Sequence, residues 1–524
     1  MKWIQTANIT QGALIAEDMR DWLPAQHAAW LVLATVRRLD LSRFHAAYRA
    51  DGKGQPPYDP AMMLALIYYC GLKDVMSTRK LRDACADDVG ARLIAGGARP
   101  SNKAFAEFKR RHRDAIGELF TQLLALLKAE GVIGDDDEVA AIDGSPVSTA
   151  AALSSNMTGA QLDAAITAAE QRLEAELQAW AASAAAGAAQ GLWDDDDPDG
   201  PGPVPPVPPG SGRKLAAAHR RLARLKAARQ RAGERAAASD AAARARLARA
   251  ADKAAAAGAR LAALEAGADA KMARYQARID AGKKWAGKKP LPADRSAKVA
   301  AARNSAAAAH ERLAAARAAC TGAAAVRVSA TDPDSRVLPA KNGGWIQGFN
   351  FQASAGRNQA LYATGTHDNP ADAGALVAMV AATDANCDRA GIARKPVKTA
   401  DSGYACQDTF SQLAGGGHGR ILVAVRKEAV QAGRRGPAGT RPVPGPWQDM
   451  AARLEEPENK KLYKKRGQYV EPFFAQLFQR NGRRIPYRGT SAVNAELGLR
   501  GQIHNLAKLL THQASTGRLI PAPA

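Results

Sequence analysis

The sequence predicts an α/β protein, in which a mixed sheet with helices on its faces follows an all-helical region and is interrupted by a long helical insert. A buried strand is predicted at residues 139–142, where Val-Ala-Ala-Ile is closed by Asp143 and a turn at Gly144. Further strands are predicted at residues 344–354, 359–367, 396–400 and 420–426, with helices between and after them. Residues 150–325 are dominated by alanine and arginine and contain few aromatics, which marks the insert.

These patterns divide the chain into four predicted segments. Residues 1–130 form a helical domain, because apolar residues recur there at helical spacing. Residues 131–150 hold the first strand of the α/β core, residues 151–325 the helical insert with a proline-rich break, and residues 326–515 the remainder of the core. We therefore expect the core to be assembled from parts of the chain that lie far apart in sequence.

The bulk composition favours a polyanionic partner. The 524 residues include 73 Lys and Arg against 51 Asp and Glu, a formal net charge of +22. Such an excess favours nucleic acid, because neutralising phosphates releases counterions. No apolar run is long enough to span a bilayer, the N-terminus lacks a signal-peptide pattern, and the five cysteines lack zinc-binding spacing. We expect a cytoplasmic, nucleoid-associated protein with reduced cysteines and no membrane segment.

Within the first segment, one short helix is a candidate DNA reader. It follows Ser101 and carries Phe105 and Phe108 on one face and a basic cluster on the other. The candidate DNA contacts in this cluster are Lys109, Arg110, Arg111 and Arg113. This pattern suits a helix-turn-helix-like domain, and an ordinary helical bundle with a solvated basic face explains it equally well.

Three acidic residues form the candidate catalytic set. Asp143 closes the first strand, Asp401 closes the strand at residues 396–400, and Glu471 lies in a helical stretch at residues 463–479. Two strand-end aspartates and a helix-borne glutamate are suited to holding two divalent cations against a phosphodiester. Each acid alone also has an ordinary explanation, as a turn, a loop start or a solvated ion-pair partner. The acidic run at residues 135–138 is interpreted as a solvated loop.

The insert is strongly basic after its proline-rich break. Residues 213–319 hold 26 Lys and Arg against 8 Asp and Glu, and their Ala/Leu/Arg periodicity suits long helices packed as a hairpin. Residues 282–291, with four lysines and a tryptophan, are the expected turn between the two arms. We favour a basic helical arm that lies on DNA. A coding bias toward alanine and arginine, with low order, is the alternative.

Several short segments, taken together, carry a family resemblance. They are Ala-Ile-Asp-Gly-Ser at 141–145, Thr-Asp-Pro-Asp-Ser-Arg at 331–336, Gly-Phe-Asn-Phe-Gln-Ala at 348–353, Ala-Asp-Ser-Gly-Tyr at 400–404, Tyr463-x-x-Arg466 with Glu-Pro-Phe-Phe at 471–474, Tyr-Arg-Gly at 487–489 and His-Asn-Leu at 504–506. As a set they resemble the ribonuclease-H-like catalytic core of DDE-type bacterial insertion-sequence transposases. The helical N-terminal region is similar to the DNA-binding domain of the same subgroup.

The resemblance implies roles for five residues. Asp143, Asp401 and Glu471 would be the metal-binding triad for two Mg²⁺ or Mn²⁺ ions, at a separation of about 3.5–4 Å. Tyr463 and Arg466, on the same helix as Glu471, would face the scissile phosphate or the flanking strand.

One family position differs in this sequence. Family members place a lysine seven residues after the glutamate, to contact DNA, and here that position is Phe478. Arg480 is the expected substitute, at a different helical angle.

The function that the resemblance implies is DNA transposition. The protein would bind the ends of its element, cleave them and join the freed 3′-OH to target DNA, as a dimer or larger assembly on DNA. A metal-dependent nuclease without strand transfer and a catalytically inactive DNA-binding or scaffold protein are the alternatives.

Overall fold

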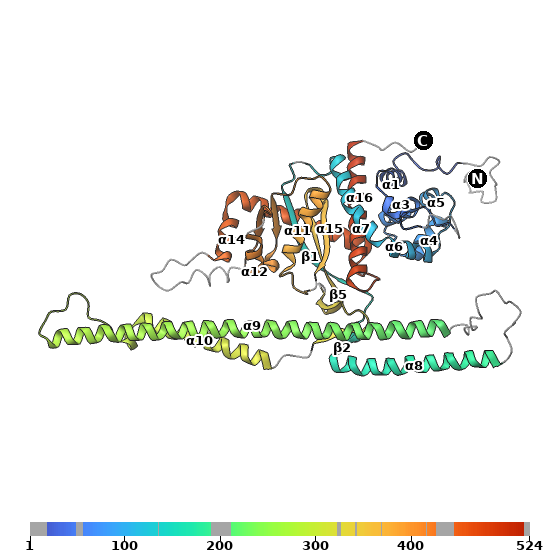
Figure 1. The fold of residues 1–524 in the computed structure, drawn as a ribbon. Coiled ribbons are helices and arrows are strands. Elements are labelled where there is room, and N and C mark those ends of the chain that lie inside the picture. The colour runs from blue at the N-terminus through green and yellow to red at the C-terminus, as the bar shows by residue number, and fades with distance from the viewer. Residues whose placement is uncertain are drawn as a thin grey trace, which may run out of the picture. The chain divides into compact units, whose positions relative to one another are not determined.

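The computed structural model describes residues 18–48, 56–134, 136–189, 211–321, 326–340, 343–367, 369–414, 417–425 and 445–517. The chain forms two compact units. Unit 1 comprises Met1–Ala151, Ser335–Arg435 and Pro442–Ala524, and unit 2 comprises Ala152–Asp334 and Gly436–Arg441 (Figure 1). Unit 1 thus contains both the N-terminal helices and the sheet. The proline-rich break and the loop at residues 426–444 lie outside the described residues.

Seven helices open unit 1 within the described ranges. They are α1 (Ala28–Arg37), α2 (Ser42–His45), α3 (Pro60–Leu72), α4 (Thr78–Asp87), α5 (Val89–Ala95), α6 (Asn102–Arg111) and α7 (Arg113–Ala129). Helix α3 is buried around most of its circumference and forms the centre of this group. It begins where Asp59 caps the first turn, by accepting hydrogen bonds from the backbone N–H groups of Ala61 and Met62, and where Pro60 fits the first helical position.

A six-stranded mixed sheet forms the centre of unit 1. Its strands are β1 (Val139–Ser148), β4 (Arg336–Pro339), β5 (Trp345–Ala355), β6 (Leu361–His367), β7 (Val397–Ala400) and β8 (Arg420–Val423). The order is β4-β5-β1-β7-β8, and β6 also pairs with β5. Strand β5 is antiparallel to β1, β4 and β6, whereas β1, β7 and β8 are parallel. The predicted mixed sheet is therefore confirmed.

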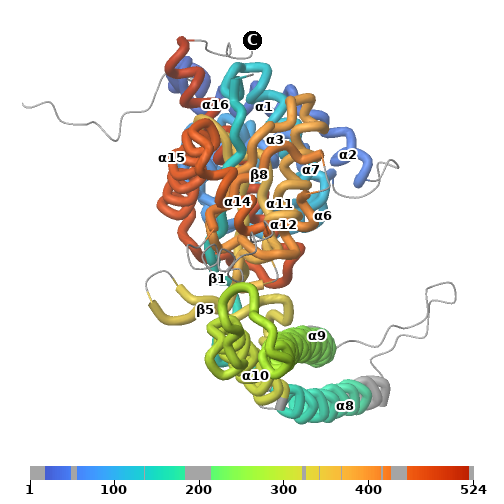
Figure 2. Tube along the Cα trace, turned by 90° about the vertical axis from the view of Figure 1, so that its left-hand side faces the viewer, coloured from blue at the N-terminus to red at the C-terminus, as the bar shows by residue number. Residues whose placement is uncertain are grey.

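Helices cover both faces of this sheet. Helix α11 (Ala375–Arg389) packs with Ile142, Ala363 and Ala400 on one face. On the other face, α15 (Pro457–Asn481) and α16 (Thr490–Thr516) pack with alternate residues of β1 and β5, because successive side chains of a strand point to opposite faces. Figure 2 shows α15 and α11 on opposite sides of the strands. Two shorter helices, α12 (Gln407–Ala414) and α14 (Pro446–Glu455), complete the described part of the core.

The first strand differs from its prediction. It does not end in a turn at Asp143 and Gly144, but continues to Ser148. Its parallel pairing with β7 covers residues 139–141, whereas its antiparallel pairing with β5 extends from Ala141 to Ser148. The long partner strand keeps β1 extended, so the Asp-Gly pair lies inside a strand. Tertiary pairing has overridden a local turn preference.

The acidic run before β1 also differs from its prediction. Asp137 is buried, with 4% of its surface exposed. Its carboxylate accepts a hydrogen bond from the Tyr362 hydroxyl and lies 3.7 Å from the Lys395 ammonium. The neighbouring Asp136 is exposed and pairs with Arg357. Asp137 is thus part of the packed core, because a hydroxyl and a buried cation replace its water.

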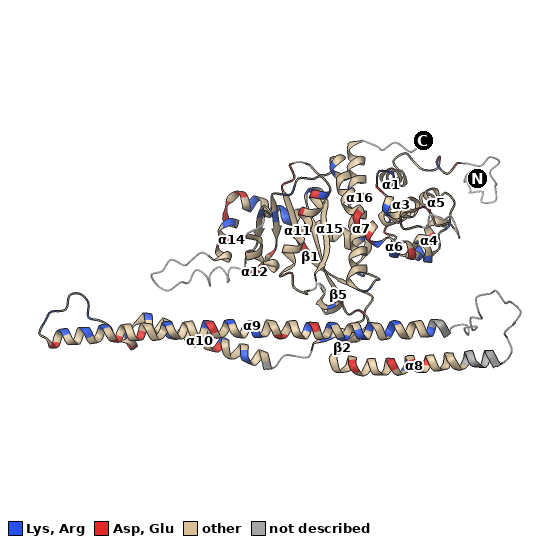
Figure 3. Ribbon diagram, in the orientation of Figure 1, with Lys and Arg blue, Asp and Glu red and all other residues tan. Residues whose placement is uncertain are grey.

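Unit 2 consists of long helices on a small two-stranded sheet. Strand β2 (Asn156–Thr158) pairs antiparallel with β3 (Arg327–Ser329), and three helices follow β2: α8 (Gly159–Ala189), α9 (Ser211–Asp280) and α10 (Ala297–Thr321). Helix α9 contains 70 residues and packs against both α8 and α10. Lysine and arginine residues recur along α9 (Figure 3). None of the described helices combines the length and apolar character needed to cross a membrane.

Candidate functional site

Strand pairing brings Asp143 and Asp401 to the same height in the sheet. Residues 139–141 of β1 pair in parallel with residues 397–399 of β7. Asp143 and Asp401 each follow these paired segments by two residues, so the two carboxylates lie beside each other at the end of β7. The Asp143 carboxylate accepts a hydrogen bond from the Gly144 backbone N–H at 2.9 Å, and the Asp401 carboxylate accepts one from the Gly403 N–H at 2.7 Å.

Glu471 is connected to Asp143 by the side chain of Arg466. The Arg466 guanidinium lies between two carboxylates, with Nη1 3.5 Å from Asp143 Oδ2 and Nη2 3.5 Å from Glu471 Oε1. The Glu471 side chain is 60% exposed, and that of Arg466 is 17% exposed. Among the described residues, no group of three or more His, Cys, Asp or Glu is close enough to hold a metal ion. Arg466 thus lies beside both Asp143 and Glu471, but the three acids do not form a group that could hold one metal ion together.

The electrostatics of the site favour the arrival of a cation. Burial raises the pKa of Asp143 to about 6, although the Arg466 guanidinium and the Gly144 N–H oppose this shift. The nearby carboxylates of Asp401 and Asp372 raise the pKa further. The positive charge of Arg466 thus does not fully offset the desolvation and mutual repulsion of the acids.

Tyr463 joins helix α15 to the sheet. Its hydroxyl donates a hydrogen bond to the Ala400 carbonyl at 3.2 Å, directly before Asp401. Partial burial raises the pKa of this hydroxyl, so Tyr463 remains a neutral donor. The contact ties α15 to the end of β7 and thereby fixes the height of Arg466 relative to both aspartates.

A second cation, Arg483, lies closer to β1 than the predicted DNA contact Arg480. Arg480 is exposed in the last turn of α15, whereas Arg483 donates a hydrogen bond from Nη1 to Ser145 Oγ at 2.9 Å. The Arg483 guanidinium also lies over the Phe478 ring, 3.9 Å from its centre. Arg483 is therefore the cation beside β1, two residues from Asp143. Helical spacing could not identify it, because it follows the end of the helix.

Lys109 is largely buried and forms an ion pair with another residue of unit 1. Its ammonium lies 3.0 Å from Glu496 Oε2 of α16 and 5.8 Å from the centre of the Tyr487 ring. The Lys109 and Glu496 side chains are only 11% and 3% exposed. Arg500 lies 3.3 Å from the same glutamate. This ion pair joins α6 to α16 and leaves little of Lys109 exposed, and its predicted contact with DNA remains a prediction.

The other three basic candidates differ in their availability. Arg110 and Arg111 are exposed and lie near Glu107 on their own helix. Arg113 is half-buried and donates a hydrogen bond to Ser491 Oγ at 3.1 Å. Arg110 and Arg111 thus remain the candidates with solvent-facing charge.

Asp372 is a fourth acid near the site, and no sequence signal marks it. It lies in the loop between β6 and α11, in the segment Pro370-Ala-Asp-Ala-Gly, where aspartate and glycine are ordinary loop residues. Its Oδ1 accepts hydrogen bonds from Asn350 Nδ2 at 2.9 Å and Gln352 Nε2 at 3.0 Å. Its place beside Asp143 and Asp401 depends on how the loop folds back onto the sheet.

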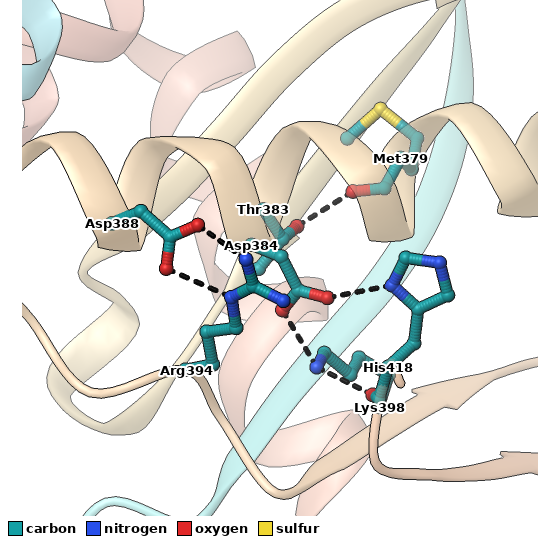
Figure 4. Close-up of polar contacts among 7 residues, drawn as sticks. All are labelled: Met379, Thr383, Asp384, Asp388, Arg394, Lys398 and His418. Carbon is teal, nitrogen blue, oxygen red and sulfur yellow. Dashed lines mark hydrogen bonds and ion pairs between the residues drawn. The ribbon is translucent and has the colours of Figure 1, made fainter. Parts of the chain in front are cut away.

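His418 belongs to an ionic cluster between β7 and α11 (Figure 4). Its Nδ1 lies 2.9 Å from Asp384 Oδ2, and the Lys398 ammonium lies 2.7 Å from Asp384 Oδ1. Lys398 also donates a hydrogen bond to the His418 carbonyl at 2.6 Å. Because Lys398 lies on β7 and Asp384 on α11, the cluster ties the strand that leads to Asp401 to its covering helix.

The other two histidines considered at the sequence level also make structural contacts. His504 is buried and its Nε2 lies 2.9 Å from the Gln359 carbonyl. Burial lowers the pKa of His504 to about 3, so the ring is neutral and Nε2–H donates this bond. His367 contacts the Ala373 carbonyl at 3.2 Å.

Two family models match the chain, one at each end of unit 1. Residues 17–111 match a transposase domain (DUF772), and residues 441–510 match a transposase DDE domain. No curated protein and no solved structure matches the chain. The second match includes Tyr463, Arg466 and Glu471, and the first covers helices α1 to α6. These two matches, which together span less than half of the chain, support a DDE-type insertion-sequence transposase.

Proposed function

We propose that this transposase cleaves the ends of its element and joins the 3′-OH to target DNA at the site formed by Asp143, Asp401 and Glu471. The observation that carries the proposal is the convergence of these acids. Pairing of β1 with β7 aligns the aspartates, and Arg466 connects Asp143 with Glu471. A sheet with an antiparallel half joined to a parallel half, covered by α11 and α15, supports a ribonuclease-H-like core.

The chemistry of the three acids suits a hard divalent cation, although their carboxylates are not close enough together here to hold one ion. Asp143, Asp401 and Glu471 offer only carboxylate oxygens, which Mg²⁺ and Mn²⁺ prefer, and burial of Asp143 gives a cation a favourable place. These residues would hold the two metal ions that the family uses. Bound there, the ions would supply an activated water or 3′-OH and stabilise the leaving oxygen.

The chain's own residues would prepare the site for a phosphodiester. Arg466 places a largely buried positive charge beside Asp143 and Glu471, where it can bind a phosphate oxygen. Tyr463 fixes α15 to the end of β7, and Arg483 presents a second guanidinium beside Ser145. Because all three are held by existing contacts, little reorganisation is needed when DNA binds.

A strand-transfer assay tests this proposal and separates its alternatives. The protein is incubated with a labelled element-end duplex, target DNA and Mg²⁺. Joined products support a transposase, cuts without joining indicate a nuclease, and a shifted band alone indicates a DNA-binding protein. Asp143→Asn should abolish cleavage and leave end binding nearly intact. Loss of end binding in this variant would contradict the catalytic role. Asp87→Asn, at an exposed aspartate of α4, is the matched control.

The helical region of unit 1 is proposed to bind the element ends. Arg110 and Arg111 lie on the exposed side of α6, whose opposite side buries Phe105 and Phe108. Charge removal at the two arginines should weaken end binding without changing the unfolding midpoint. Two ends must meet for transposition, so we expect a dimer or larger assembly on DNA, which mass photometry of the end complex would show.

The helices of unit 2 are proposed to form a basic arm on DNA. Between α9 and α10, Trp285 packs edge-on against Tyr275 at a ring separation of 5.5 Å, which orders a loop with four lysines. The lysines are Lys283, Lys284, Lys288 and Lys289, all exposed.

Salt dependence measures this contribution. Replacing all four lysines by glutamine should reduce the slope of log K against log[salt] by about 0.9 for each lost phosphate contact. Replacing them by arginine keeps the charge and should keep the slope. An unchanged slope in the glutamine variant would exclude this loop from the DNA interface.

A further inference from the structure

Helix α9 carries a series of cations along one of its sides. Eleven lysine and arginine residues follow one another at intervals of 3, 4, 7 or 11 residues, and each of these intervals returns to nearly the same side of an α-helix. Two of them, Arg231 and Arg235, bond to Asp334 within unit 2. The other nine are exposed, and we call them the basic flank: Arg220, Arg224, Arg246, Arg249, Lys253, Arg260, Lys271, Arg274 and Arg278.

The charges on the other sides of α9 are arranged differently. At about 100° per residue, all six acidic residues of α9 lie about 80° or more from the centre of the basic flank. On the side that α8 covers, Lys226 pairs with Glu170 and Arg229 pairs with Asp163, each at 2.8 Å. Among the described residues, by contrast, no carboxylate pairs with any member of the basic flank. The charge of this flank is therefore available to a polyanion outside the chain.

The spacing of the basic flank is close to the helical repeat of DNA. Eight of its members fall into three groups, at residues 220–224, 246–253 and 271–278. The centres of neighbouring groups are about 40 Å apart at a rise of about 1.5 Å per residue, and one turn of B-DNA is about 34–36 Å long. A duplex presents the same strand to one side once per turn. Long arginine and lysine side chains can cover the remaining few ångströms.

The basic flank continues into the loop that follows α9. Arg278 Nε donates a hydrogen bond to the Lys284 carbonyl at 2.9 Å, and the Lys289 ammonium lies 5.6 Å from the centre of the Tyr275 ring. These contacts fix the lysines of the loop to the end of the flank. Because the cations are carried by one continuous helix, little order has to be gained when a polyanion binds.

We propose that the basic flank of α9 lies along duplex DNA and contacts the phosphate backbone once per turn, over roughly 25 base pairs. This inference rests on the proposed function, since it names the surface through which the basic arm binds DNA. Contacts to phosphates hold DNA irrespective of its sequence. A duplex fits this surface better than a second copy of the chain, because α9 holds 17 Lys and Arg against 6 Asp and Glu and so repels another α9.

Two single substitutions in α9 form a matched test of the full chain. Arg246→Gln removes a cation of the basic flank, and Arg244→Gln removes an exposed cation on the opposite side of the helix. Binding to a random-sequence duplex of about 40 base pairs, longer than the proposed contact, is measured by fluorescence anisotropy at several salt concentrations. Arg246→Gln should reduce the slope of log K against log[salt] by about 0.9, and Arg244→Gln should not change it. The unfolding midpoint should stay the same in both, because glutamine and arginine have similar helix propensity.

The outcomes separate this inference from the proposed function. Equal reductions of the slope in both variants would overturn the inference, because the arm would then bind DNA without a preferred side, while the proposed basic arm would stand. An unchanged slope in Arg246→Gln would also overturn it, and the glutamine variant of the loop lysines would then show whether the arm binds DNA at all. If Arg246→Gln leaves the slope unchanged and instead dissociates an oligomer of the DNA-free protein in sedimentation, the flank binds a second copy. None of these results alters the strand-transfer test of the candidate catalytic site.

Discussion

Asp143→Asn should stabilise the metal-free protein at neutral pH. Burial raises the pKa of Asp143 to about 6, against an ordinary value of about 3.9. A shift of about two units corresponds to roughly 3 kcal/mol of folding free energy. Since the folded pKa lies above the unfolded one, this contribution is present below about pH 4 and is lost as pH rises through 6. Asparagine carries no charge and avoids the loss.

Urea unfolding in EDTA between pH 4 and pH 8, followed by near-ultraviolet circular dichroism, measures this difference. The free energies of unfolding of wild type and variant should nearly coincide at pH 4. They should diverge between pH 4 and 6 and differ by about 3 kcal/mol above pH 7. Added Mg²⁺ should stabilise the wild type and have little effect on the variant. Asp87→Asn, at an exposed carboxylate, should show no such pH-dependent gain.

A lower free energy of unfolding for Asp143→Asn than for the wild type at pH 8 would refute this reasoning. If Asp143→Asn is less stable than the wild type in EDTA, the attraction between Asp143 and Arg466 exceeds the cost of burying the carboxylate. Arg466 would then already balance the charge of Asp143. The argument that the buried carboxylate favours cation binding would no longer hold.

Three further substitutions have defined expected outcomes. Lys109→Met should lower the free energy of unfolding by about 3 kcal/mol in urea, because it removes one partner of a buried ion pair; an unchanged value would place this charge on the surface. Tyr362→Phe should cost about 1–3 kcal/mol in the same measurement, because buried Asp137 loses a hydroxyl donor. Arg483→Gln should slow cleavage of an end duplex by at least about tenfold, and Arg480→Gln should not; equal effects would remove the distinction between them.

The sequence predicted the strands where local pattern and tertiary structure agree. The strands expected at residues 344–354 and 359–367 are close to β5 and β6, since apolar and aromatic residues follow strand periodicity there. The extension of β1 beyond Asp143 was not predicted, because an Asp-Gly pair locally favours a turn and only the distant partner β5 keeps it extended.

Partners that are distant in sequence explain the other differences. Lys109 looked like a DNA contact within its basic cluster, yet its partner Glu496 is 387 positions away. Asp372 and Arg483 lie in loops, so no periodicity relates them to the acids that they approach. A pattern within one segment indicates which charges are present, but not which of them the fold neutralises.

The insertion of unit 2 between β1 and β5 has a consequence for biosynthesis. About 200 residues separate these neighbouring strands, so at typical translation speeds β1 leaves the ribosome about 10–40 s before β5. During this interval an apolar strand has no native neighbour and is exposed to wrong partners. Gly144 and Pro146 interrupt its capacity for regular pairing and lower that hazard. The strand that carries Asp143 therefore remains without its native neighbour β5 until residues 345–355 have been synthesised.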